Sequence, residues 1–466
     1  MQTNFSLGQL ADPQNYASEK ILRACVHCGF CTATCPTYVL LGDELDSPRG
    51  RIYLIKNMLE ADAPATPEVV KHIDRCLSCL SCMTTCPSGV HYMHLVDHAR
   101  EHIEQTYKRP LADRMLRALL ARVLTDPALF RLAAVAGWLA KPLAPVMRAL
   151  GLTRLAAMVS LTPSRMLAPP GDRTGKVHPA IGTRRGRVAL LSGCINPVLA
   201  PSTNESAIRM LNRNGIEVVV ARGEACCGSL VHHMGREEQA LAQARNNIDA
   251  WMAEMTGEGL DAILVTVSGC GTTVKDYGFM LRTDEAYARK AARVSALAKD
   301  VTEYLATLDL QPATAPKHST KPLTVAYHSA CSLQHGQRVV REPKDLLSKF
   351  GFVVKDVPES HLCCGSAGTY NILQPELAGQ LRDRKVANIE RLLPDVIAAG
   401  NIGCITQIGG GTAIPVVHTV ELLDWASGGP VPAPLAEFAA AKAASEEAAS
   451  ERRDAAAARP EAVLLN

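Results

Sequence analysis

Two short stretches of this chain share one cysteine pattern, and they decide the fold of its first quarter. They are CVHCGFCTATCP (Cys25–Pro36) and CLSCLSCMTTCP (Cys76–Pro87). In both, two, two and three residues separate successive cysteines, and a proline follows the fourth. Two intervening residues let successive thiolates curl around one metal cluster, and the proline then turns the chain away. The pattern therefore indicates eight metal ligands.

The same spacing binds [4Fe–4S] clusters in bacterial ferredoxins, where the fourth cysteine of each run ligates the other cluster. Applied here, that rule gives two ligand sets. The first cluster is assigned to Cys25, Cys28, Cys31 and Cys86, and the second to Cys76, Cys79, Cys82 and Cys35. Zinc is the alternative, but zinc sites use four ligands in two pairs and do not explain two such runs with trailing prolines. The sequence therefore predicts two [4Fe–4S] clusters.

The segment between the two runs is long and has a helical pattern. In SPRGRIYLIKNMLE (Ser47–Glu60), the apolar residues Ile52, Ile55 and Leu59 recur at helical spacing. Ser47 suits a helix cap and Pro48 a first helical turn. We therefore predict a helix-rich two-cluster ferredoxin domain over residues 1–107, in place of the compact β-hairpin kind.

The remaining eight cysteines form a second duplication. Cys194 precedes the Cys226-Cys227-Gly228 turn by 32 positions, and Cys331 precedes the Cys363-Cys364-Gly365 turn by the same 32. One further cysteine closes each unit, and these two are Cys270 and Cys404. The copies are offset by 137 positions at the first three landmarks and by 134 at the last. Such constant offsets indicate a true internal repeat.

Each copy alternates apolar strands with amphipathic helices, which predicts a parallel sheet. The predicted strands are Arg187–Leu191, Ile216–Val220 and Ala262–Val267 in the first copy, and Leu323–Tyr327, Phe352–Val354 and Val396–Cys404 in the second. The cysteines follow the carboxyl ends of these strands, where open α/β sheets place their sites. The sequence thus predicts a multidomain α+β protein, with the ferredoxin domain followed by two tandem α/β CCG (cysteine-rich) repeats at 187–310 and 321–427.

The chemistry of the CCG turns has more than one interpretation. Adjacent cysteines on a strand point in opposite directions, so a turn is needed for both to face one cofactor, and Gly228 and Gly365 permit it. A metal or cluster site is the favoured interpretation; a vicinal disulfide or simple buried thiols are the alternatives. The eight cysteines are a candidate further redox site, with one or two additional clusters left open. None of the nearby histidines is claimed as a ligand: His232, His233, His328, His335, His361 and His418.

Composition limits the classes of function. The net charge of +3 and the 4% aromatic content argue against nucleic-acid binding. Neither a signal peptide nor an uninterrupted apolar stretch of membrane-spanning length is visible, so we expect a cytoplasmic protein, where cysteines serve metals or catalysis. Gly409–Gly411 lacks the lysine of a phosphate-binding loop, and no dinucleotide-binding motif is visible.

Two segments lie outside these domains. Residues 108–186 form a connector, and within Lys108–Arg165 ten basic residues stand against two acidic ones among leucine, alanine and valine. Such a segment can lie on an anionic membrane surface or bind a partner. Packing as a helical linker, or partner docking, is favoured over direct membrane binding, and Pro169–Arg187 is expected to be an exposed linker. The tail, residues 428–466, is expected to be disordered or to form a lone, weak helix.

At this point the chain closely resembles the iron–sulfur subunits of bacterial glycolate oxidase, also called glycolate dehydrogenase. The most discriminating segments are PTYVLLGDELDSPRGRIYLIK (residues 36–56) and SHLCCGSAGTY (residues 360–370), and the resemblance covers roughly residues 1–425. The CCG repeats are also similar to those of heterodisulfide reductase subunits, which typically end in C-x2-C. Here Cys270 and Cys404 have no such second cysteine, so each repeat offers four thiols instead of five.

The resemblance implies a division of labour. A partner subunit bearing FAD would oxidise glycolate to glyoxylate, and a second flavoprotein-like subunit would complete the complex. This chain would relay electrons from that FAD to an acceptor such as a membrane quinone, as a peripheral protein on the cytoplasmic face of the inner membrane. Two alternatives stay open: the iron–sulfur subunit of anaerobic glycerol-3-phosphate dehydrogenase, and a heterodisulfide-reductase-like enzyme acting at the CCG repeats.

Overall fold

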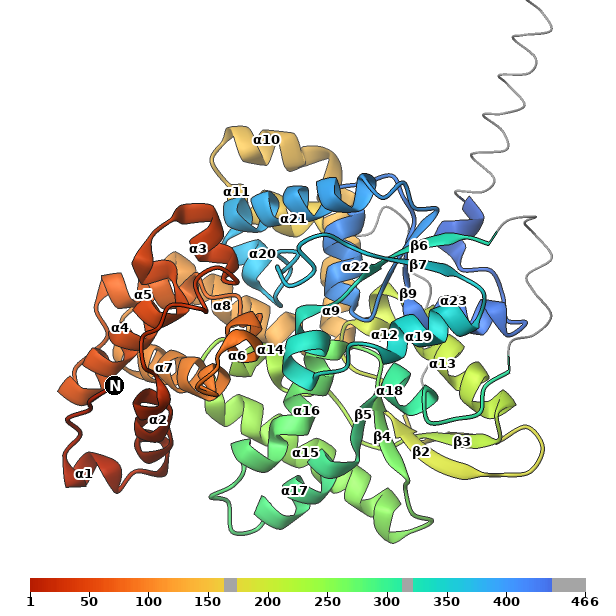
Figure 1. Ribbon diagram of the computed structural model, residues 1–466, viewed down its shortest axis with the longest axis horizontal. Coiled ribbons are helices and arrows are strands. Elements are labelled where there is room, and N and C mark those ends of the chain that lie inside the picture. The colour runs from red at the N-terminus through yellow and green to blue at the C-terminus, as the bar shows by residue number, and fades with distance from the viewer. Residues whose placement is uncertain (163–173, 312–321, 438–466) are drawn as a thin grey trace, which may run out of the picture.

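The computed structural model describes residues 1–162, 174–311 and 322–437. Figure 1 shows the N-terminal helices gathered on one side and two sheets on the other, with the connector helix α9 (Pro127–Ala140) between them. This arrangement, with a helical domain followed by two α/β units, is the multidomain α+β fold that the sequence predicts.

The N-terminal region is built from helices, and residues 1–162 contain no strand. Helix α4 (Pro48–Ala61) begins where the sequence predicts it. The Ser47 side chain accepts a hydrogen bond from Gly50 N at 3.0 Å, and Pro48 occupies the first turn. Its buried Ile52, Ile55 and Leu59 confirm the predicted apolar face. The helices are α1 (Leu7–Leu10), α2 (Pro13–Ala24), α3 (Pro36–Leu41), η1 (Glu44–Asp46), α4 (Pro48–Ala61), α5 (Pro67–Asp74), α6 (Ser81–Thr85) and α7 (Tyr92–Thr106).

The connector continues as helices whose outer faces are exposed. They are α8 (Leu111–Val123), α9, η2 (Lys141–Leu143), α10 (Ala144–Ala149) and α11 (Thr153–Ser160). Within the described residues, only the helical stretch Pro127–Ala149 is long and apolar enough to cross a membrane, and its apolar window is 11% buried. The sequence did not predict it because Arg131, Lys141 and Arg148 interrupt its apolar run. Length and composition fit an exposed apolar helix as well as a membrane span.

The first CCG repeat forms a five-stranded sheet in the order β1-β3-β2-β4-β5. Its strands pair in parallel except β1, which is antiparallel to β3 at the edge. The strands are β1 (Lys176–His178), β2 (Gly186–Leu190), β3 (Ile216–Val220), β4 (Ala262–Val265) and β5 (Ala298–Asp300). The helices are α12 (Asn196–Leu199), α13 (Pro201–Arg213), α14 (Ser229–His232), α15 (Glu237–Thr256), α16 (Ser268–Met280), α17 (Ala288–Leu297) and α18 (Val301–Leu305).

The second repeat reproduces this sheet without the antiparallel edge, in the all-parallel order β7-β6-β8-β9. The strands are β6 (Thr324–His328), β7 (Val353–Asp356), β8 (Val396–Ala399) and β9 (Val416–His418). The helices are η3 (Ser332–Gln337, a π-helix), α19 (Glu342–Lys349), α20 (Tyr370–Leu373), α21 (Pro375–Glu390), α22 (Ile402–Gly409) and α23 (Thr419–Ala426).

Some sequence-based expectations need correction. The expected linker Pro169–Arg187 contains strand β1, while residues 163–173 lie outside the described part. Cys270 and Cys404 do not end strands; they lie in the first turns of α16 and α22, because β4 and β8 end earlier. In the tail, Leu435 is 7% exposed and packs on the core, and residues 438–466 lie outside the described part.

The three parts share buried contacts. One core cluster contains residues of both sheets, including Leu264 and Tyr327. A smaller cluster joins Leu77 of the second cysteine run to Tyr370 and Leu377 of the second repeat. Because these contacts are apolar and buried, the ferredoxin domain is held against the second repeat at the level of its CCG turn.

Candidate cluster-binding sites

The two ferredoxin runs adopt matching backbone turns. His27 and Gly29 in the first run have positive φ angles of 54° and 85°. Ser78 and Leu80, at the same positions of the second run, have φ angles of 48° and 60°. Such left-handed residues let a short chain curl its side chains inward, although they are unusual for residues other than glycine. The repeated turn follows from the repeated cysteine spacing.

The residues assigned to the first cluster surround one small cavity of about 30 Å³. Its cysteines are Cys25, Cys28, Cys31, Cys82 and Cys86. Burial raises the pKa of Cys31 to about 11, with the nearby Cys25 and Cys35 thiols adding to the rise. The structure thus brings together all four cysteines of the predicted first set, including the crossing Cys86, and adds Cys82 at the wall.

The residues assigned to the second cluster also lie near one another. Burial raises the pKa of Cys82 well above its usual value, and the thiols of Cys79, Cys76 and Cys35 raise it further. Cys35 comes from the first run, so it reaches across the domain as the crossing pattern requires. Because Cys82 also borders the first cavity, the two sets are neighbours.

Two buried donors face the sulfur atoms of the second set. Arg51 Nη1 lies 3.7 Å from Cys35 Sγ, and the hydroxyl of Tyr92 lies 3.8 Å from Cys76 Sγ. Arg51 is 1% exposed and pairs with the fully buried Asp46 at 3.2 Å. Hydrogen bonds and positive charge at cluster sulfurs favour the reduced, more negative state. Arg51 and Tyr92 are therefore placed to stabilise the reduced state of a cluster bound at this site.

The first CCG repeat gathers its four thiols at the sheet's carboxyl edge. Cys194 and Cys227 both donate toward Cys226, which lowers the pKa of Cys226 to about 4. The hydrogen bond to Cys226 raises the pKa of Cys194, and burial adds to the rise. Cys227 also contacts Cys270. The turn depends on Gly228, whose φ is 87°.

The second repeat repeats this arrangement with Cys331, Cys363, Cys364 and Cys404. Hydrogen bonds from Cys331 and Cys364 lower the pKa of Cys363 well below its usual value. Cys364 in turn contacts Cys404. Both repeats therefore gather sulfur donors around the first cysteine of the CCG turn, and clustered cysteine sulfurs are the donor chemistry that selects iron–sulfur clusters and other soft metal centres.

One histidine lies beside the thiols of the second CCG repeat and has no counterpart in the first repeat. His328, at the end of β6, is 1% exposed and has no hydrogen-bond partner on either ring nitrogen. Its ligand atom, and those of Cys364 and Cys404, all lie within 4.8 Å of one another. His328 is not identifiable as a ligand from the sequence, because only the fold places it beside the thiols. The matching position in the first repeat is Leu191.

The helices after the two CCG turns also differ. In the first repeat, Asn247 donates to Cys226 O at 3.0 Å and accepts from Ala225 N at 2.8 Å. In the second, the buried Lys385 donates to Glu359 O at 2.7 Å. Burial lowers the pKa of Lys385, while the thiols of Cys364, Cys331 and Cys363 oppose that shift. Among the described residues, a buried lysine thus lies beside the thiols of the second repeat, where the first repeat has the neutral Asn247.

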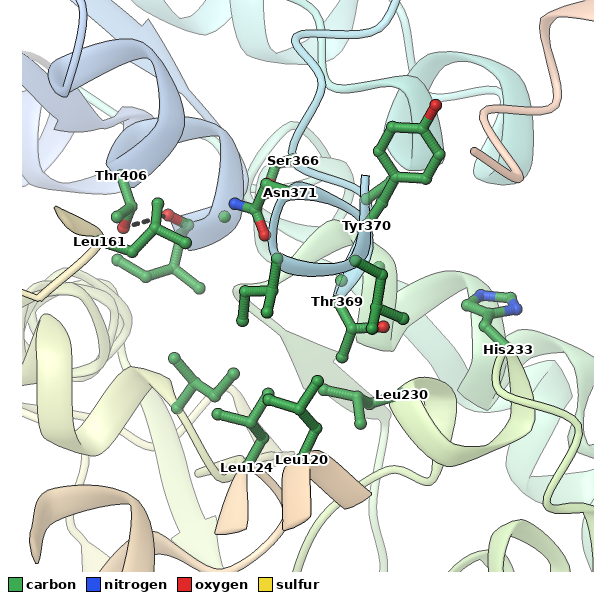
Figure 2. A pocket seen from close by; sticks show the side chains of 18 of the residues that line it. Leu120, Leu124, Leu161, Leu230, His233, Ser366, Thr369, Tyr370, Asn371 and Thr406 are labelled. Atoms are coloured by element: carbon green, nitrogen blue, oxygen red, sulfur yellow. Dashed lines mark hydrogen bonds between the residues drawn. The ribbon is translucent and has the colours of Figure 1, made fainter. Parts of the chain in front are cut away.

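A single cavity of about 610 Å³ connects these sites. Its walls include cysteines of the second ferredoxin run and of both repeats: Cys76, Cys79, Cys194, Cys226, Cys227, Cys270, Cys331, Cys363, Cys364 and Cys404. Cys79 packs on the apolar cluster that contains Cys363, and after burial the Cys363 thiol also raises the pKa of Cys79. Figure 2 shows Tyr370 and Asn371 of α20 beside this cavity, opposite Leu120 and Leu124 of the connector.

The fold and these sites define a class of protein: an iron–sulfur protein with a two-cluster domain and a duplicated cysteine-rich α/β domain. A model of the 4Fe-4S dicluster domain matches residues 21–90, and a model of the cysteine-rich domain matches residues 188–275 and 325–409. The chain belongs to the family of glycolate oxidase iron–sulfur subunits.

Three relatives illustrate the extent of the match. The glycolate oxidase iron–sulfur subunit of Escherichia coli strain K12 is 44% identical over 91% of this chain and 99% of its own length. The probable glycolate oxidase iron–sulfur subunit of Bacillus subtilis strain 168 is 30% identical over 87% of this chain and 94% of its own. Lactate utilization protein A of Bacillus licheniformis is 26% identical over 51% of this chain and 99% of its own.

Proposed function

We propose that this chain is the electron-transfer subunit of a glycolate dehydrogenase complex. It takes electrons from FAD on a partner subunit, which oxidises glycolate to glyoxylate, and passes them to an acceptor such as a quinone. The observation that supports this best is the continuity of the thiols, because Cys79 of the ferredoxin domain and Cys363 of the second repeat line one cavity and belong to one packed cluster. The near full-length similarity to glycolate oxidase iron–sulfur subunits supports the choice of substrate.

The predicted ligand sets have distinct roles in this proposal. A [4Fe–4S] cluster, when bound, accepts and releases one electron. Cys25, Cys28, Cys31 and Cys86 would hold the first, and Cys76, Cys79, Cys82 and Cys35 the second. The CCG thiols, with His328 in the second repeat, would hold one or two further redox centres. Arg51, Tyr92 and Lys385 would tune the sites through charge and hydrogen bonding.

The surface around Cys28 suits the docking of the flavin-bearing subunit. Cys28 is exposed, and its neighbours Val26 and Phe30 are 66% and 65% exposed. Exposed apolar side chains beside a redox site are typical of protein interaction surfaces. A second flavoprotein-like subunit would complete the complex, as the family resemblance implies.

We also propose that the complex lies peripherally on the cytoplasmic face of the inner membrane. The outer face of the connector offers Leu132, Leu139 and Leu150, which are 68%, 67% and 70% exposed. Residues 108–162 also hold nine basic side chains against two acidic ones. Apolar side chains beside excess positive charge suit an anionic lipid surface.

The first test measures iron and sulfide per chain, with low-temperature EPR of the reduced, anaerobically purified protein. About eight irons and two interacting [4Fe–4S] signals would support the ferredoxin assignment alone. More iron, lost on replacing Cys226 and Cys227 or Cys363 and Cys364 with serine, would place further clusters in the repeats. Zinc in place of iron, in strictly anaerobic preparations, would overturn the proposal.

The crossing assignment has its own matched pair of variants. Cys86→Ser should remove the first cluster's EPR signal and leave the second, while Cys35→Ser should do the reverse. If each variant instead removed the cluster of its own run, the crossing would be wrong while electron transfer could still stand.

A further inference from the structure

One wall of the large cavity contains no cysteine and is apolar. Opposite the thiols, the connector helices line it with apolar side chains: Leu120, Leu124, Phe130, Ala134, Met158 and Val159. Apolar side chains offer no ligand to iron, so this half of the cavity is not part of a cluster site. The cavity has a volume of about 610 Å³, thiol half included, so the apolar half is one part of a space large enough for a small molecule beside a redox centre.

This apolar half reaches the surface of the molecule. Leu119 of α8 and Leu155 of α11 both line the cavity, and they are 51% and 43% exposed. The opening therefore lies among the same connector helices that expose Leu132 and Leu139. A lipophilic molecule held at that surface can enter without crossing water.

A buried polar group faces the cavity from the other side. Asn371 is 9% exposed and donates from Nδ2 to Gln407 at 3.1 Å, while its Oδ1 has no partner. Figure 2 shows this amide facing the space between Leu161 and the leucines of α8. An unpaired buried acceptor is costly, so a ligand that donates a hydrogen bond to it is favoured.

A network of hydrogen-bonding groups adjoins the same cavity, and its member His233 is also partly exposed to solvent. His233 lines the cavity, and its Nδ1 lies 3.2 Å from Asp97 Oδ1. Asp97 Oδ2 lies 3.5 Å from His232 Nε2, and His232 Nδ1 lies 2.7 Å from Glu237. Alternating histidines and carboxylates are the groups proteins use to move protons near neutral pH.

We infer that the cavity binds a quinone, the lipophilic acceptor, and that the His233–Asp97–His232 chain supplies its protons. This inference rests on the proposed electron-transfer function. The quinone gains two electrons that originate in the reduced flavin of the partner subunit, and two protons that His233 donates and the Asp97–His232–Glu237 network helps to replace. The product is a quinol, whose hydroxyl donates to Asn371 Oδ1. A soluble protein acceptor could not reach the thiols through this cavity.

Binding is tested with a photoreactive azido-quinone on the full chain, followed by peptide mapping. We expect labelling on the connector helices and α20, suppressed by excess decylubiquinone. Labelling confined to the outer face of α9, or unaffected by the competitor, would mean adsorption to an apolar surface and would overturn the inference. This readout does not depend on the activity of the loaded protein.

Cavity-filling variants test the same site in the reduced complex. Ala134→Phe and Leu120→Trp should each slow reoxidation by decylubiquinone by at least about tenfold, by removing space that the acceptor needs. Leu393→Trp, on a leucine that is 85% exposed and does not line the cavity, is the matched control. Unchanged quinone kinetics in both filled variants would overturn the inference.

Ferricyanide separates this inference from the proposed function, because it is hydrophilic and takes one electron without a proton. Asp97→Asn should slow reduction of decylubiquinone by about tenfold while reduction of ferricyanide stays unchanged. Equal slowing with both acceptors would overturn the proton route. If the wild-type complex reduced neither acceptor, the proposed electron relay itself would fail.

Discussion

At the scale of single residues, the CCG turns depend on two glycines that are not equally constrained. Both have left-handed backbone angles, with φ of 87° at Gly228 and 88° at Gly365. A methyl group at Gly228 would lie 3.0 Å from Ala240 O, and one at Gly365 only 2.5 Å from Ala378 O. The second turn therefore has less room than the first.

This difference predicts a graded effect of alanine substitution on stability. Gly223 has the same left-handed angle, φ 86°, but open space around it, so Gly223→Ala should cost only about 1–2 kcal/mol of backbone strain. Gly228→Ala should cost more and Gly365→Ala most. Urea unfolding followed by circular dichroism measures the order; equal losses for all three would contradict the steric argument.

A second residue-scale prediction concerns Arg51. Replacing it leaves the fully buried Asp46 with one ion-pair partner fewer, so Arg51→Gln should lower the free energy of unfolding by about 3 kcal/mol. Arg49→Gln, on the same helix, breaks only the exposed pair with Glu44 and should cost less than about 1 kcal/mol. Similar losses in the two variants, measured by urea unfolding, would mean that the buried pair adds nothing.

At the scale of elements, the two repeats begin their last helices with equivalent caps of different chemistry. Asp300 caps α18 and His418 caps α23, each in a capping box. His418 accepts from Val420 N and donates to Thr266 O, so the folded state needs a neutral ring. Burial lowers its pKa to about 4.

The depressed pKa of His418 predicts a loss of stability in acid. Below the unfolded pKa near 6.5, the unfolded chain binds a proton that the folded chain refuses until about pH 4, so stability falls as the pH falls through that window. From pH 7 to pH 5 this group alone accounts for about 2 kcal/mol. His418→Asn can still cap and should lose about that much less over the same range. An unchanged pH slope would exclude His418 as a source.

The long elements were predictable from the sequence, and the short ones were not. Helix α4, which begins after Ser47, and strand β3, which follows Gly215, have clear apolar patterns. The 137-residue offset predicts that the second sheet repeats the first. Strands β1, β5 and β9 have three residues each, too few for an alternation to be visible. Their pairing partners, not their own sequences, make them strands.

At the scale of the whole molecule, the exposed connector predicts binding to lipid. The double variant Leu132→Glu with Leu139→Glu should bind vesicles containing phosphatidylglycerol several-fold more weakly, because both leucines lie on the exposed outer face. Vesicle flotation at low and high salt measures this, and salt should weaken the wild type through screening. Leu393→Glu is the control. Equal vesicle binding by the double variant and the wild type, at low and high salt alike, would contradict the proposed membrane-binding surface.

The candidate cavity could not be predicted from the sequence, because distant parts of the chain form it. Its walls come from the second cysteine run, the connector and both repeats, and its lining extends from Asp74 to Thr406. The cysteines themselves were all identifiable from spacing. His328, Asn371 and the leucines of α8 gain their meaning only from the packing of three domains, which no local pattern encodes.

The uneven burial of the thiols determines the order in which oxygen should damage the protein. Cys28 is exposed, whereas Cys227 and Cys364 are 2% and 0% exposed. Dissolved oxygen and peroxide attack accessible sulfur first. Damage should therefore begin at the exposed Cys28 and reach the buried thiols of the repeats later. If the flavin-bearing subunit docks over Cys28 as proposed, assembly of the complex would shield this thiol from oxidants.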